Sequence, residues 1–212
     1  PSQSVYIVKA DGETLEGKTR LVVSTSRGIK TISVVLPSGE LAKFTASEIQ
    51  EVGFRNNALT RAQSTNDQAS SLKKILKADW NQIYKQEYIV YSRVILPSGK
   101  PVLMQQLNPG FDTRIKVYYS LGSRKTSGIG IPLANAGPIA PASIKLTGGR
   151  QRAYWVSKDD GKVFKLRRGN YNKKNFKSLF GDSAGMDAIR RPYRFKQFPA
   201  HVFFYDEIQK RK

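Results

Sequence analysis

Short runs of β-branched and aromatic residues, separated by turn residues, recur through the first 56 residues of the chain. Runs of this length and composition predict a β meander. After the third run, Pro37-Ser38-Gly39 predicts a turn, because proline presets φ and glycine accepts a positive φ. The segment 46–54 fits either a short helical turn or a last strand. The runs that carry this prediction are 5–8, 21–23, 32–36 and 41–44.

A polar stretch, 55–71, follows and is rich in Asn, Gln, Ser and Thr. Because it is poor in apolar residues, it is the best candidate for a domain boundary. A helix is predicted to begin near Asn66. Apolar residues then recur at helical spacing, namely Leu72, Ile75, Leu76 and Trp80.

The strand pattern returns over 88–96, 102–106 and 115–121. The segments 35–39 and 95–99 are near copies that both end in Pro-Ser-Gly. A duplicated β unit and the recurrence of a favoured hairpin turn both explain the repeat, and we favour the recurring turn. Residues 123–142 have almost no periodicity and are expected to form a loop.

The C-terminal region predicts a hairpin and then helices. Two short apolar runs flank Asp159-Asp160-Gly161, which is a strong hairpin signal. Helical segments are expected at 173–180, 184–191 and about 199–209. The predicted fold class is therefore α+β, with β-rich N-terminal and central antiparallel sheets or meander, a mid-chain helix and a helical C-terminal end. The expected divisions are a small β module (1–56), a polar connector with a helix (57–87) and a β-sheet region ending in helices (88–212).

Composition excludes several kinds of chemistry. The 212 residues include no cysteine, which removes disulfides, thiolate metal sites and cysteine nucleophiles. No apolar run reaches the roughly 18 residues that cross a bilayer, so no transmembrane segment is predicted. Neither a dinucleotide fingerprint nor a Walker motif occurs, and we expect no cofactor.

Charge is the strongest compositional signal. The chain carries 36 Lys and Arg against 16 Asp and Glu, a net charge of +20. Residues 143–212 alone contribute +12 of it. A field of this sign attracts polyanions such as nucleic acid, anionic lipid or acidic glycan.

The basic residues interleave with Phe and Tyr over 162–177 and continue through 196. A surface that follows phosphates and stacks on bases needs this combination. The alternative, which we favour, is a solvated basic face whose aromatic side chains point into the core. The candidate polyanion-binding residues are Lys162, Lys165, Arg167, Arg168, Tyr171, Lys173, Lys174, Lys177, Arg190, Arg191 and Arg194.

No catalytic group is predicted. Gly181-Asp182-Ser183-Ala184-Gly185 is similar to the segment around a trypsin-like nucleophile, but the only histidine, His201, follows the serine. We therefore expect Asp182 or Ser183 to cap the following turn. A single histidine without cysteine makes a transition-metal site improbable. A carboxylate-dependent glycan hydrolase, with Trp80 or Trp155 as a sugar platform, is kept as a third hypothesis.

Three segments at the two ends of the chain carry a resemblance to a known family. They are Asp11-Gly12-Glu13-Thr14-Leu15-Glu16-Gly17-Lys18, Tyr154-Trp155-Val156-Ser157-Lys158 with Gly161-Lys162-Val163, and 175–182 with a final apolar helix ending near Tyr205. In these segments the chain resembles uncharacterised exported proteins of Bacteroidetes-type bacteria. That family commonly has a cysteine shortly after the Phe-x-Asp position, where Ser183 stands here. The resemblance implies an exported, envelope-associated protein and supplies no catalytic residues.

Two expectations for function stand beside the glycan hydrolase. The first is a non-enzymatic exported or envelope-associated bacterial protein, in the periplasm or secreted, whose signal peptide has been removed ahead of Pro1 and which acts as an interaction or structural module. The second is a nucleic-acid-binding module that uses the basic–aromatic segment 162–196, and a cytoplasmic location stays open with it. The partner is unknown, and a polyanion (anionic lipid, acidic glycan or nucleic acid) is the candidate.

Overall fold

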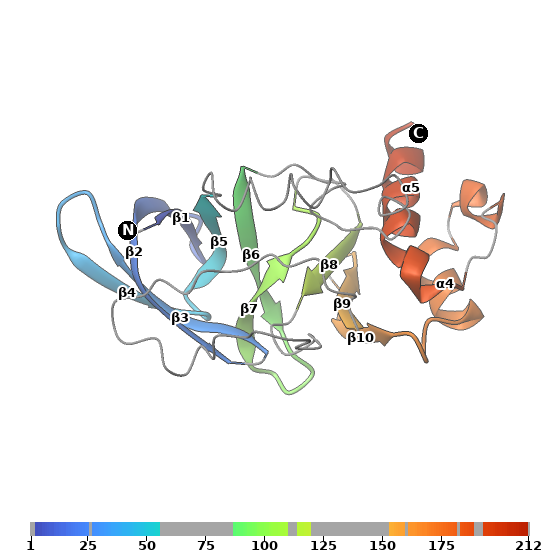
Figure 1. Cartoon of the computed structure of the whole chain (residues 1–212), viewed down its shortest axis with the longest axis horizontal. Coiled ribbons are helices and arrows are strands. Elements are labelled where there is room, and N and C mark those ends of the chain that lie inside the picture. Colours follow the sequence, from blue (N-terminus) through green and yellow to red (C-terminus); the bar gives the residue numbers. More distant parts are fainter. Residues whose placement is uncertain are drawn as a thin grey trace, which may run out of the picture.

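The fold is described from a computed structural model of the whole chain (Figure 1). The residues that the structure describes are 3–25, 27–55, 87–109, 114–119, 153–159, 161–181, 183–188 and 193–211. The predicted mid-chain helix and the predicted loop at 123–142 lie outside these residues.

Antiparallel strands make up most of the described chain, and helices follow at its C-terminal end. The strands are β1 (Ser4–Lys9), β2 (Thr14–Thr25), β3 (Gly28–Val35), β4 (Leu41–Thr45), β5 (Ile49–Arg55), β6 (Tyr88–Ile95), β7 (Pro101–Gln106), β8 (Ile115–Tyr119), β9 (Ala153–Lys158) and β10 (Phe164–Arg167). The helices are α4 (Lys173–Phe180) and α5 (Phe198–Lys210), with short 3-10 turns η3 (Ala184–Ala188) and η4 (Phe195–Gln197).

Six of the strands close into an antiparallel barrel. They are hydrogen-bonded in the order β7-β6-β5-β1-β2-β3, and a pairing of β3 with β7 completes the ring. β4 extends the sheet from β3, while β8, β9 and β10 extend it from β7. The barrel therefore contains strands that precede residues 56–86 in the sequence and strands that follow them. Its interior is filled by buried apolar residues of both groups, including Ile7, Ile32, Phe54 and Leu103.

β7 can pair with both β3 and β8 because the two partners use different parts of one edge. Leu103 faces Ile29 of β3, whereas Gln105 and Gln106 face β8. Closure brings the backbones close together at Gly28, where an added Cβ would lie 2.5 Å from the Leu103 carbonyl oxygen. A glycine is therefore required at this corner of the barrel.

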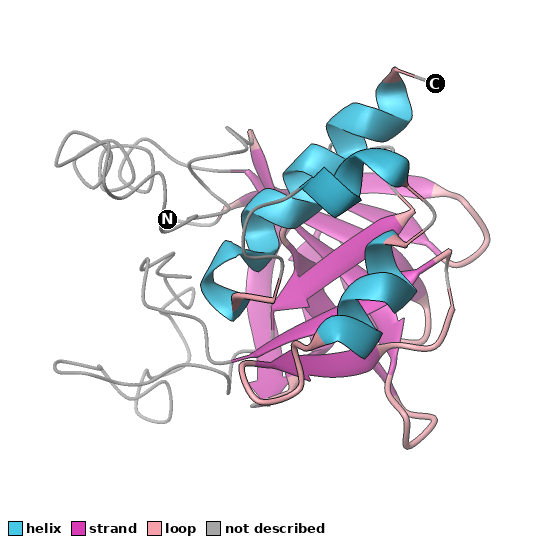
Figure 2. Ribbon diagram, turned by 90° about the vertical axis from the view of Figure 1, so that its right-hand side faces the viewer, coloured by secondary structure: helices cyan, strands magenta, loops and turns pink. Residues whose placement is uncertain are grey.

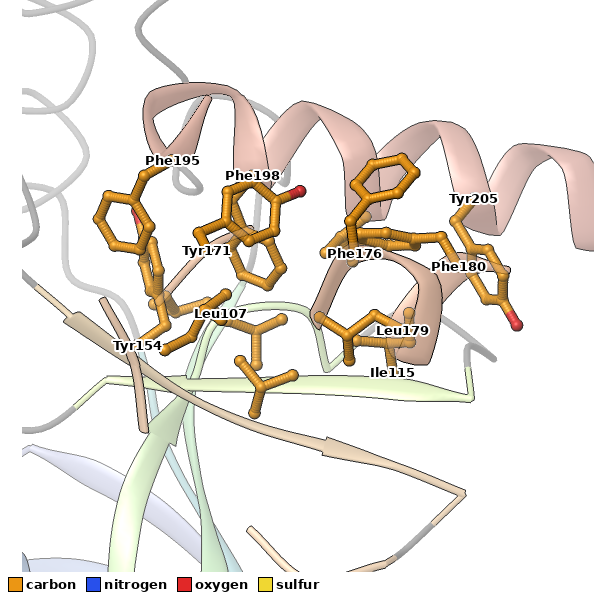
Figure 3. Close-up of a cluster of buried hydrophobic side chains, with 14 of the residues drawn as sticks. Leu107, Ile115, Tyr154, Tyr171, Phe176, Leu179, Phe180, Phe195, Phe198 and Tyr205 are labelled. Carbon is orange, nitrogen blue, oxygen red and sulfur yellow. The ribbon is translucent and has the colours of Figure 1, made fainter. Parts of the chain in front are cut away.

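The C-terminal strands carry the helices on one face. Alternate residues of β8 and β9, such as Val117 and Val156, face α4 and α5 and belong to a second buried cluster. Figure 2 shows the helices lying over these strands, and Figure 3 shows aromatic side chains filling the space between the two layers. The opposite face of the same strands packs Tyr118 and Trp155 with Val94 and Met104 of the barrel strands.

Much of the predicted secondary structure is confirmed. The strands at 88–96 and 102–106, the hairpin around Asp159-Asp160-Gly161 and the helix at 173–180 are present, and α5 extends the predicted last helix by about one residue at each end. Of the predicted helix at 184–191, the described part is the 3-10 turn η3. The coarse class is corrected to mostly β, because a closed barrel replaces the open N-terminal meander.

The segment 46–54 forms a turn and then a strand, where the sequence predicted either a short helical turn or a last strand. Residues 46–48 form a turn, and β5 then begins at Ile49. β5 does not continue the meander beside β4 but returns to pair with β1. Its apolar residues Ile49, Val52 and Phe54 point inward, as predicted.

Candidate polyanion-binding surface

The basic and apolar residues of β10 lie on opposite faces of the strand. Phe164 and Leu166 pack against the cluster beneath the helices, whereas Arg167 is exposed and Lys165 is partly exposed. Period-2 alternation along a strand produces this separation. Among the strands that the structure describes, β10 is the last of the sheet, so its cations lie at the edge of that sheet.

Lys165 and Arg167 border an open pocket of about 400 Å³ together with Gly169 and Asn170. The Lys165 ammonium lies 5.7 Å from the centre of the Trp155 ring, its cross-strand neighbour. Burial, with a smaller contribution from the Arg167 charge, lowers the pKa of Lys165 below its usual range. An anion in this pocket would relieve the repulsion between the two cations.

Asn170 fixes the turn that leads from β10 to α4. Its side-chain amide donates to the Lys165 carbonyl over 2.8 Å, and its own carbonyl accepts a hydrogen bond from the Asn175 side chain over 2.6 Å. Asn172 caps α4 by accepting from the Asn175 N–H. The strand, the turn and the helix are therefore held in one arrangement.

The charges in the first turn of α4 have the sign that destabilises a helix N-terminus. Its first turn has no acidic residue and starts with Lys173 and Lys174, although a helix N-terminus favours negative charge. Lys177 lies one turn further on, where like charges repel. All three side chains are exposed and none forms an ion pair among the described residues. Positive charges that destabilise their own helix are expected where the surface serves binding.

The aromatic side chains of the segment do not join the cations at the surface. Tyr171 is 3% exposed and Phe176 is 5% exposed, and both belong to the cluster between the helices and the strands (Figure 3). Tyr171 was a candidate polyanion-binding residue, and the structure places it in the core instead. Period explains the difference, since Phe176 shares the inner face of α4 with Leu179 and Phe180.

Tyr171 and the single histidine form a buried pair. Tyr171 Oη and His201 Nδ1 lie 2.6 Å apart and share a hydrogen bond. Burial lowers the pKa of His201 to about 4 and raises that of Tyr171 far above its ordinary value. Aromatic rings of Phe176 and Phe180 surround the imidazole. A neutral histidine in this setting is a packing residue and has no open side for a substrate.

Of the remaining catalytic candidates, the structure describes Ser183 and Trp155. Ser183 is buried, and its hydroxyl has no hydrogen-bond partner, so it does not cap the next turn as predicted. Its main-chain carbonyl accepts from the Met186 N–H instead. Asp182 and Trp80 lie outside the described residues, and Trp155 is partly covered by Lys165. Within the described ranges, no group of three or more His, Asp or Glu side chains could hold a metal ion.

Eight of the ten candidate cations lie on or beside β10, α4 and η4. We call this set the basic surface; it consists of Lys162, Lys165, Arg167, Arg168, Lys173, Lys174, Lys177 and Arg194. Lys162 precedes β10, and Arg194 precedes η4. Arg190 and Arg191, also candidates, lie outside the described residues. None of the eight cations makes an ion pair within the described chain.

Sequence reasoning missed a second group of cations on the barrel. Arg27, Lys30 and Lys100 border one pocket but are scattered over 74 positions of the chain. Since no local run of basic residues marks them, only the fold brings them together.

Comparison with known proteins adds no further identification. No protein-family model, curated protein or solved structure matches this chain. In the part of the chain that the structure describes, no helix is long and apolar enough to span a membrane.

Proposed function

We propose that this chain is a non-enzymatic, envelope-associated bacterial binding module whose basic surface holds an anionic partner by charge. The observation that carries the proposal is the basic surface itself: its cations make no ion pair with the residues that the structure describes, and the aromatic side chains beside them are buried. Such a surface attracts anionic groups without selecting their shape.

Anionic lipid headgroups suit this arrangement best. A membrane surface presents many negative charges at once and needs no aromatic contact, so Lys173, Lys174 and Lys177 at the exposed side of α4 are sufficient for it. An exported protein of the kind that the chain resembles works beside such a surface. The expected envelope location and the charge distribution therefore both favour an anionic lipid surface as the partner.

Nucleic acid is the alternative partner, since exposed lysines and arginines serve a phosphate backbone equally well. Single-strand binding also relies on bases stacking on aromatic rings. Tyr171 and Phe176 cannot supply this stacking from the core. The alternative therefore reduces to sequence-independent contact with the phosphates of a duplex.

Vesicle sedimentation tests the proposal. The full chain should bind vesicles of equal parts phosphatidylcholine and phosphatidylglycerol, and should leave pure phosphatidylcholine vesicles unbound. Each lysine near an anionic surface contributes about 1 kcal/mol, so the triple variant K173Q/K174Q/K177Q should partition roughly 100-fold less.

A matched control removes three exposed charges from β2 and β4, as K18Q/R20Q/K43Q. It should reduce partition far less than the α4 variant does. Equal losses in both variants would show that only net charge matters and would contradict the proposal. Tighter binding to duplex oligonucleotide than to the anionic vesicles would replace it with the alternative.

A further inference from the structure

Three loops meet at one rim of the barrel and enclose a pocket of about 470 Å³. They are the β2–β3 hairpin, the turn at 45–48 and the β6–β7 hairpin, which projects at the lower edge of the barrel in Figure 1. The pocket is separate in the chain from the basic surface, with which it shares no residue.

Hydrogen bonds hold the three loops in place. The Ala46 N–H donates to the Lys30 carbonyl over 2.8 Å, which ties the turn to β3. Arg93 Nη1 donates to the Ser47 carbonyl over 3.0 Å, which ties the same turn to β6. Within the β6–β7 hairpin, the Gly99 N–H donates to the Leu96 carbonyl. The pocket walls are thus fixed by backbone contacts and need little reordering when a ligand enters.

Positive charge lines the rim of the pocket. Arg27, Lys30 and Lys100 are exposed, and none of them forms an ion pair among the described residues. Glu48, which follows the lining residue Ser47, is engaged by Thr45, whose N–H and hydroxyl donate to it over 2.7 and 2.6 Å. The lining of the pocket therefore includes three cationic residues and no carboxylate.

The floor of the pocket is apolar. Ala46, Leu96 and Val102 belong to the lining and are themselves buried, and Pro101 is its partly exposed apolar residue. Thr25, Thr45 and Ser47 complete the lining. The volume lies in the range of small-molecule sites, about 300–1,000 Å³, and exceeds what an inorganic anion fills. A ligand with an anionic group at the rim and an apolar body on the floor matches both parts.

We propose that this barrel pocket binds a small phosphate monoester that carries an apolar body. Phosphate fits better than carboxylate because a phosphate monoester approaches two negative charges at neutral pH, and three cations face it. The lining accounts for the body, since covering Pro101 and the alkyl stems of Lys30 and Lys100 removes apolar area from water.

Phenyl phosphate is the probe that tests the pocket. Titrated into the isotope-labelled full chain, it should shift the amide resonances of Gly28, Ala46 and Gly99 in a saturable way. Inorganic phosphate should bind at least tenfold more weakly because it lacks the body, and phenol should not bind. Benzoate binding as tightly as phenyl phosphate would overturn the assignment to phosphate.

Substitutions locate the site. The double variant K30Q/K100Q should weaken phenyl phosphate binding at least tenfold, whereas K43Q, which removes an exposed charge from β4, should leave it unchanged. The variant K173Q/K174Q of the basic surface should also leave it unchanged. Shifts spread over all lysine-rich segments, or an equal loss in K43Q, would overturn the proposal. These outcomes do not depend on whether the basic surface binds vesicles.

Discussion

At the scale of single residues, buried polar groups decide how the C-terminal layer is held together. Asn108 is fully buried and joins the end of β7 to β8: its amide donates to the Ile115 carbonyl over 2.8 Å, and its Oδ1 accepts from the Val117 N–H over 2.9 Å. His201 is a second such group, bonded to Tyr171 within a cluster of aromatic rings. Neither role could be predicted from the sequence, because residue type alone does not reveal a buried partner.

Replacing Asn108 with alanine should lower the free energy of unfolding by about 2–3 kcal/mol. The substitution leaves a buried carbonyl and a buried N–H without partners, and each costs roughly 1–3 kcal/mol. Urea unfolding measures the loss. Asn108→Asp, which keeps the acceptor, should retain part of the stability, and an unchanged midpoint for the alanine variant would contradict the role of this side chain.

His201 should make the protein less stable as the pH falls. Its pKa is about 4 in the folded chain against 6.5 for an ordinary histidine, so between these values the unfolded chain binds a proton that the folded chain does not. The free energy of unfolding should therefore fall by up to about 1.4 kcal/mol per pH unit from pH 6.5 downward and level off below pH 4.

Urea unfolding over a pH series checks this slope. The control is His201→Asn, which offers Tyr171 a hydrogen-bonding group near the position of Nδ1. It should be less stable overall and should lack the histidine part of the slope. A slope identical in both proteins would contradict a buried neutral histidine.

At the scale of elements, local pattern predicts strands, hairpins and helices but not their long-range pairing. The helix at 173–180 and the hairpin before it follow from spacing and turn residues. The return of β5 to β1 and the contact of β3 with β7 join distant residues, and no local period encodes them. The alternation of basic and aromatic residues in β10 is typical of a strand with one buried face. This pattern correctly predicted that Phe164 points inward.

Barrel closure should depend on Gly28. Alanine at this position would place a Cβ 2.5 Å from the Leu103 carbonyl oxygen, so the β3–β7 contact must open and stability should fall by about 2 kcal/mol or more. Urea unfolding compares it with Gly169→Ala, where an added Cβ meets nothing within 4 Å. Equal effects of the two substitutions would contradict closure at Gly28.

Lys173 in the first turn of α4 should lower the stability of the protein and strengthen its binding to anionic vesicles. Lys173→Glu gives the helix N-terminus a favourable charge and should raise the free energy of unfolding by about 0.3–1 kcal/mol. The same change should weaken binding to anionic vesicles by more than Lys43→Glu does. A more stable variant with undiminished binding would show that Lys173 belongs to a solvated face only.

At the scale of the whole molecule, one continuous sheet connects a barrel to a helix-covered layer, and positive charge is concentrated at the far edge of that layer. The net charge of +20 and its C-terminal excess are plain in the sequence. Which cations share a surface is not, because that depends on β10 being the edge strand and on α4 turning its apolar side inward. The barrel pocket depends still more on the fold, since its cations come from two hairpins that are far apart in the sequence.

The most direct test of the central claim is the partition of the full chain onto the phosphatidylcholine–phosphatidylglycerol vesicles across a salt series, beside the K173Q/K174Q/K177Q variant. If the basic surface binds by charge, partition should weaken steeply as salt rises, and the variant should show both weaker binding and a shallower dependence. Binding that is insensitive to salt, or a variant with an unchanged salt dependence, would contradict the account.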